Sequence, residues 1–166
     1  MSLRDEIKQN KPFASLREEA VLNIMRTASL IAWEAGEAFR PFGLTTTQYN
    51  VLRILRGAGA DGLPCGAIAE RMVTRDSDIT RLLDRLTGMH LVERGRAPAD
   101  RRVVTVRITG AGLDLLAKLE PVIHELQLRQ LGHLDSTTLA GLISALESAR
   151  ERPAVSLSTT DTTITS

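Results

Sequence analysis

The chain has 166 residues, of which 43% are hydrophobic and 25% are charged, so it can form a packed soluble domain with an appended helical element. Charged residues interrupt the apolar stretches well short of the roughly 20 residues that span a bilayer, and residues 1–12 lack the apolar segment of a signal peptide. We therefore expect a cytoplasmic protein with no membrane segment. The single cysteine excludes an internal disulfide and a four-thiolate zinc site.

Capping patterns mark the starts of the first two long helices. Ser15 with Glu18, and Thr45 with Gln48, stand three residues apart as in a capping box. Apolar residues then recur at helical spacing in both runs. The predicted ends are Pro41 with Gly43 for the first helix, and Gly57 or Gly59 for the second.

Two shorter helices are predicted next, the third from about Cys65 to Met72 and the fourth at about 75–88. Apolar residues of the fourth helix stand at i, i+3, i+4 and i+7, so they should face the core. The predicted apolar stripes are Ile68, Ala69 and Met72 in the third helix and Ile79, Leu82, Leu83 and Leu86 in the fourth. The same spacing places Ser77, Asp78, Arg81 and Arg85 on the opposite face of the fourth helix.

Two alternating, β-branched segments at 91–94 and 103–108 read as strands. The residues between them, about 95–102, contain Gly95 and Pro98 and should form the loop of a hairpin. Three helices followed by a hairpin is the order of a winged helix-turn-helix domain, which we place at 43–109.

Two further helices follow, capped by Thr109 and Asp135, and Pro121 should kink the first of them. The helices at both ends carry apolar faces that the central domain cannot cover alone, so residues 15–42 and 110–151 are predicted to form a homodimer. Residues 1–14 form an N-terminal arm, and residues 152–166, rich in Ser and Thr, a disordered tail. The expected fold is mainly α with a small β-hairpin, a winged helix-turn-helix domain flanked by N- and C-terminal dimerisation helices.

Charge is distributed unevenly along a chain whose net charge is only +1. Residues 71–107 contain nine arginines and five acidic residues, a local charge of +4, whereas the rest of the chain carries −3. Arginine is well suited to phosphate and guanine contacts. The segment contains no aromatic residue to stack on single strands, so duplex DNA is the better partner.

Three stretches together resemble the MarR family: LTTTQYNVLRIL (44–55), TRDSDITRLLDRLTGMHLVER (74–94) and DRRVVTVRITGAG (100–112). The resemblance implies a transcription regulator, most often a repressor, whose outer helices interlock two subunits into a dimer on a palindromic operator. It further implies that the fourth helix enters the major groove and that the wing, about 95–102, reaches the minor groove. Many members release DNA when a small aromatic or phenolic ligand binds between the dimerisation and DNA-binding parts.

The resemblance assigns roles to particular residues. Arg81 is the best candidate for reading base edges, and Arg102, oriented by Asp100, for entering the minor groove. Asp76 and Asp78 could accept from cytosine or stabilise the helix N-terminus, and the second role is favoured for Asp76. The alternatives without a role in binding are a solvated helix face for the fourth helix and an exposed ion pair for Asp100 and Arg102. The candidate DNA-binding residues are Arg75, Ser77, Asp78, Thr80, Arg81, Arg85, Arg96, Asp100, Arg101 and Arg102.

The chain also departs from the family pattern. His90 stands where the family usually has glycine, and it should adopt a left-handed conformation, which His tolerates better than most residues. The first long helix lacks the reactive cysteine of the family's peroxide sensors, which argues against that type of sensing.

Other chemistries find little support in the residues. Cys65 should be a buried or half-buried structural thiol rather than a redox switch, because no cationic neighbour or second cysteine accompanies it. His124 and His133, nine residues apart in the fifth-helix region, do not make a closed metal site by themselves. No nucleotide loop, nucleophile elbow or zinc-protease motif is present, so we expect no enzyme, no cofactor and no metal. The alternative to a DNA-binding regulator is a winged-helix module that binds proteins.

Overall fold

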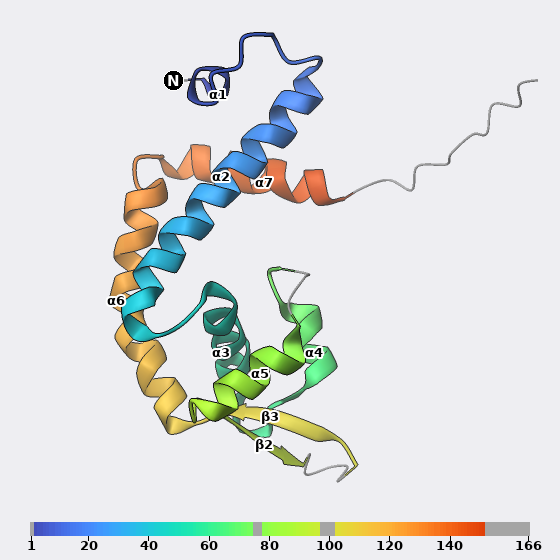
Figure 1. Cartoon of the computed structure of the whole chain (residues 1–166), viewed down its shortest axis with the longest axis vertical. Helices are drawn as coiled ribbons and strands as arrows, with labels where there is room; N and C mark the ends of the chain where they lie inside the picture. Colours follow the sequence, from blue (N-terminus) through green and yellow to red (C-terminus); the bar gives the residue numbers. More distant parts are fainter. Residues whose placement is uncertain (1, 75–77, 97–101, 152–166) are drawn as a thin grey trace, which may run out of the picture. The chain divides into compact units, whose positions relative to one another are not determined.

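The computed structural model describes residues 2–74, 78–96 and 102–151 (Figure 1). It divides into two compact units, 1–130 and 131–166. The described helices and strands are α1 (Leu3–Glu6), α2 (Leu16–Phe39), the 3-10 turn η1 (Arg40–Phe42), α3 (Thr46–Ala58), the 3-10 turn η2 (Gly59–Asp61), β1 (Leu63–Pro64), α4 (Cys65–Arg71), α5 (Ile79–Gly88), β2 (Val92–Arg96), β3 (Val104–Ile108), α6 (Gly110–Leu131) and α7 (Ser136–Arg150).

The predicted starts of α2 and α3 are confirmed, with different capping. The Ser15 hydroxyl accepts from the Glu18 N–H at 3.1 Å, but the Glu18 carboxylate accepts from the N–H of Ala14, so the capping box is only half formed. In α3 both halves are present: the Thr45 hydroxyl accepts from the Gln48 N–H at 3.2 Å, and Gln48 Oε1 accepts from the Thr45 N–H at 2.9 Å. These local bonds explain why sequence spacing located the helices.

Glycines in the left-handed region end these helices. α2 gives way to η1, after which Gly43 has φ 67°, as the Pro41–Gly43 signal predicted. Of the two ends proposed for α3, Gly59 is correct, with φ 71°. Positive φ at both positions favours glycine, since it carries no Cβ.

The small sheet has three antiparallel strands among the described residues, in the order β1-β3-β2, where the sequence predicted a two-stranded hairpin. Strand β1 pairs Leu63 with Val106. It is preceded by Gly62, where an added Cβ would lie 2.4 Å from the Val106 carbonyl oxygen. The second correction concerns β2, which continues through Gly95 to Arg96, so these two residues belong to the strand rather than to the loop.

The core of the first unit joins α3, α4, α5, the sheet and the N-terminal half of α6. All four residues of the predicted α5 stripe are buried, as expected. The α4 stripe is only partly right: Ile68 is fully buried and Met72 half-buried, but Ala69 is exposed. The fully buried side chains are Val51, Leu52, Leu55, Ile68, Leu83, Leu86, Val92, Leu116 and Leu119.

The long helix α6 begins at the predicted cap, because the Thr109 hydroxyl accepts from the Gly112 N–H at 3.1 Å. It continues through Pro121 to Leu131. His133 follows it in a turn, and thus lies outside the helix in which the sequence had placed it. In the second unit, α7 is capped as predicted by Asp135, which accepts from the Thr138 N–H at 2.7 Å.

Residues 1–14, expected as an arm, contain the short helix α1. Its Leu3 is buried, and Glu6 pairs with Arg26 of α2 at 3.3 Å. Helix α2 exposes apolar side chains along its length, among them Met25 at 62% and Trp33 at 66%. No helix within the described part of the chain combines the length and the apolarity needed to cross a membrane.

Candidate nucleic-acid interface

Helix α5 presents a polar face opposite its buried stripe. Thr80, Arg81 and Arg85 are all exposed, and the helix is anchored by Ile79 and Leu83 beneath them. The helix begins at Ile79, not at residue 75, because the backbone of its N-cap Asp78 (φ −65°, ψ 85°) is not helical. Of the predicted site residues, Arg75, Ser77, Asp100 and Arg101, like Asp76, lie outside the described residues.

Asp78 holds Arg81 at two points. Its Oδ1 accepts from the Arg81 backbone N–H at 3.2 Å, and its Oδ2 lies 3.3 Å from Arg81 Nε. Asp78 is therefore the N-cap of the helix, and stabilising the helix N-terminus was one of the two roles that the sequence left open for it. The Arg81 side chain nevertheless remains 82% exposed.

A second ion pair links α5 to the hairpin. Arg94 of β2 donates to Asp84 of α5 at 2.5 Å, and both side chains are about half exposed. The sequence had not indicated this pair. Asp84 follows Arg81 by three residues and so shares its helix face, which was the available signal, but its partner comes from a strand whose distance from α5 depends on the folded sheet.

The base of the wing brings two more candidates to the same end of the hairpin. Arg96 is the last residue of β2 and pairs with Val104, the first residue of β3. Arg102 precedes that residue by two positions, and both arginine side chains are exposed. The described candidates therefore fall into two groups, one on α5 and one where the wing leaves the sheet.

The chain immediately after α4 is held by a side chain of α3. Asn50 Oδ1 accepts from the backbone N–H of Val73 at 3.0 Å. Val73 itself is 85% exposed. This side-chain contact fixes the backbone where the chain leaves α4, and no short sequence pattern indicated it, because its partners are 23 residues apart.

His90 joins α5 to β2 in the predicted left-handed conformation, with φ 57°. Its carbonyl oxygen accepts from the Thr109 hydroxyl at 2.8 Å, so the end of α5 is tied to the start of α6. A further bond closes the turn, from the N–H of Leu91 to the Leu86 carbonyl at 3.0 Å.

The structure corrects one expectation about other chemistry. Cys65 is exposed at the first position of α4, which corrects the prediction of a buried or half-buried thiol. Cys65 is the first residue of the helix, and because helical side chains tilt toward the N-terminus, its side chain points away from the turn that Ile68 anchors in the core. Within the described ranges no group of three or more His, Cys, Asp or Glu side chains is placed to hold a metal ion.

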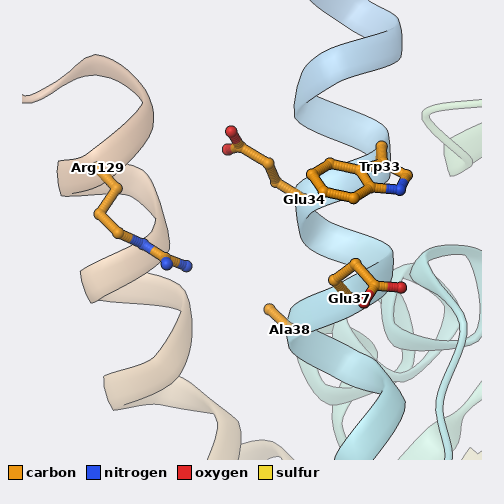
Figure 2. A pocket seen from close by; sticks show the side chains of 5 residues that line it. All are labelled: Trp33, Glu34, Glu37, Ala38 and Arg129. Carbon is orange, nitrogen blue, oxygen red and sulfur yellow. The ribbon is translucent and has the colours of Figure 1, made fainter.

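A hollow of about 440 Å³ lies between α2 and the C-terminal part of α6 (Figure 2). Arg129 extends from α6 toward Glu34 and Ala38 of α2, while the Trp33 ring lies against α2. Glu37, the remaining lining residue, pairs with Arg40 at 2.7 Å.

Comparison with known proteins gives consistent results. The model of the MarR family matches residues 44–104. The HTH-type transcriptional regulator MhqR of Bacillus subtilis is 33% identical over 79 residues, which are 48% of this chain and 53% of that protein, so the match spans about half of this curated relative.

Solved structures extend the similarity over most of the chain. A MarR transcription factor from Planctomyces limnophilus is 43% identical, with a TM-score of 0.62, covering 82% of this chain and 99% of that one. A mutant MarR from E. coli in complex with operator DNA has a TM-score of 0.68 and covers 90% and 99%. At 22% identity, it shows a common fold.

Proposed function

The chain belongs to the MarR family, and we propose that it is a regulator of transcription that binds palindromic duplex DNA as a homodimer. The observation that carries the proposal is that one small domain exposes two groups of arginines. One group lies on α5 and the other at the base of the wing. A relative with the same fold is bound to operator DNA. The mainly helical fold with its small sheet is that of the family.

In this proposal α5 enters the major groove. The helix has ten residues and so is about 15 Å long, and its buried stripe holds it rigidly against the domain. Arg81, near its N-terminus, reads base edges, and Arg85, one turn further, contacts phosphate. Arg102 enters the minor groove from the wing, and Arg96 contacts the backbone beside it.

The proposed homodimer uses the exposed apolar side chains of α2. Such side chains on a long helix are costly to leave in water and are typical of subunit interfaces. Met25→Glu should convert the dimer to a monomer in light scattering, because it places a charge within that face. Asn23→Glu, which adds the same charge at a polar position of the same helix, should leave the dimer intact. A dimeric Met25→Glu protein would contradict the assignment of α2.

The hollow beside Arg129 is the proposed site for a small aromatic or phenolic ligand. The guanidinium of Arg129 can pair with a carboxylate or phenolate of the ligand, and the ring of Trp33 can stack on its aromatic group. Salicylate is a suitable probe. A ligand that binds only the folded state raises the melting temperature by mass action, so salicylate should raise that of the wild type. It should not raise that of Arg129→Ala, which lacks the guanidinium. An equal shift in both proteins would place the binding elsewhere.

The test of DNA binding is its dependence on salt. If each subunit makes three to five phosphate contacts, log K should fall against log salt with a slope of roughly −0.9 per contact. Selection from a random 30-bp duplex library supplies the sites. Binding that is insensitive to salt, or that enriches no sequence, would favour a protein-interaction module instead.

A further inference from the structure

Arg81, the arginine assigned to base readout, does not stand alone on its helix face. The carboxylate of Asp78 contacts it twice, at the backbone N–H (3.2 Å) and at Nε (3.3 Å). The other carboxylate on this face, Asp84, is engaged by Arg94 of β2. The two acidic side chains of the described part of α5 and its cap are therefore committed to different arginines.

The ion pair with Asp78 leaves the two terminal nitrogens of Arg81 accessible for contacting a base. A guanidinium has five N–H donors, of which Nε supplies one and the two terminal nitrogens supply four. Asp78 contacts Nε, and the Arg81 side chain is 82% exposed, so its terminal nitrogens can be reached by a ligand. Two such nitrogens can donate side by side to O6 and N7 of guanine.

The same carboxylate also fixes where the side chain starts. By capping the helix, Asp78 sets the first turn, on which Arg81 is the third residue. An unsupported arginine has many rotamers to lose when it binds, and a side chain already held in one geometry loses fewer. One residue thus restrains both the base and the tip of the arginine.

We infer that Asp78 is a positioning residue that holds Arg81 in the orientation for reading a base, and so contributes to sequence specificity without contacting DNA itself. This inference rests on the proposed DNA-binding function. Placing Asp78 there has an electrostatic cost, because a carboxylate beside the duplex repels the phosphates. Asp78 should therefore weaken binding to all sequences while sharpening the preference among them.

Asp78→Asn separates this role from capping. Asparagine caps helices as well as aspartate, so its Oδ1 can keep the bond to the Arg81 N–H. The second oxygen becomes an NH₂ group, which cannot accept from Nε. Asp78→Ser is a second capping variant that cannot bridge to Nε, should the asparagine protein fold poorly. Asp84→Asn is the matched control, the same chemical change on the same helix with a different arginine partner.

The experiment compares the sequence preferences of these proteins by selection from a random 30-bp duplex library. Asp78→Asn should lose about threefold to tenfold of the preference at the base positions where Arg81→Ala also loses it, while its affinity for random duplex rises. In the Arg81→Ala background, Asp78→Asn should change no base preference. Asp84→Asn should retain the wild-type preference at those positions.

A measurement without DNA tests the contact itself. The Nε–H signal of Arg81 in an NMR spectrum, assigned by its absence in Arg81→Lys, should move and exchange faster in Asp78→Asn. Wild-type preference in Asp78→Asn, or an equal loss in Asp84→Asn, would overturn the inference. If the wild type enriches no sequence, the proposed function fails and the specificity role with it, although the NMR signal would still report the ion pair.

Discussion

Gly112→Ala tests whether the start of α6 is packed directly against the end of the hairpin where β2 begins and β3 ends. An added Cβ at Gly112 would lie 2.4 Å from the Leu91 carbonyl oxygen and 2.7 Å from Ile108 Cγ1. In an open helix the substitution stabilises by up to about 1 kcal/mol. Here the backbone carbonyl cannot rotate away, and overpacking costs about 1–3 kcal/mol. The net expectation is a loss of about 1–2 kcal/mol.

The assay is thermal unfolding followed by circular dichroism at one fixed protein concentration. For a chain of this length the loss corresponds to a fall in melting temperature of roughly 3–6 °C. Gly110→Ala, in the same turn of α6, is the control, because among the described residues nothing besides its chain neighbours and its own helix backbone lies within 4 Å of the added Cβ. That variant should melt at or slightly above the wild-type temperature. A Gly112→Ala protein as stable as Gly110→Ala would refute the packing argument.

His90→Gly should raise the free energy of unfolding by about 0.5–1 kcal/mol in a denaturant titration, because glycine accepts φ 57° without the Cβ penalty. Arg81→Ala should lose about 1–3 kcal/mol of binding free energy on a selected site and less on random duplex. Arg102→Ala should weaken binding without changing the melting temperature of the protein. An unchanged affinity of Arg102→Ala would show that the wing does not contact DNA. The Thr138 N–H holds the pKa of Asp135 below 3.8, so the α7 cap contributes stability above that value and loses it as pH falls through the lowered pKa; amide exchange in α7 measures this, and Asp135→Asn should abolish the pH dependence.

Local interactions made much of the fold predictable. Capping residues at Ser15, Thr45, Thr109 and Asp135 bond to groups three residues away, so their spacing in the sequence is the structure itself. The apolar stripe of α5 repeats with the helical period and is buried throughout. The left-handed conformation of His90 was predicted from the resemblance to the MarR family, which usually has glycine at that position.

The candidate interface was only partly predictable, because only some of its interactions are local in the sequence. Its residue types and approximate places came from the arginine-rich segment and from the order of elements. Which acidic residue caps α5 depended on the residue at which the helix begins, and the N-cap is Asp78. The roles of Arg81 and Arg102 in binding DNA stay predictions for the experiments above.

Contacts between distant residues were decided only by the tertiary structure. Strand β1 has two residues and no periodicity to detect, and it exists because Leu63 meets Val106, more than forty residues later, beside a glycine that allows the close approach. Asn50 bonds to Val73, and Asp84 to Arg94, across elements whose separation no sequence spacing encodes. Hydrogen bonds within one helical turn are written in the order of residues, whereas pairings between elements exist only after the core has brought their backbones together.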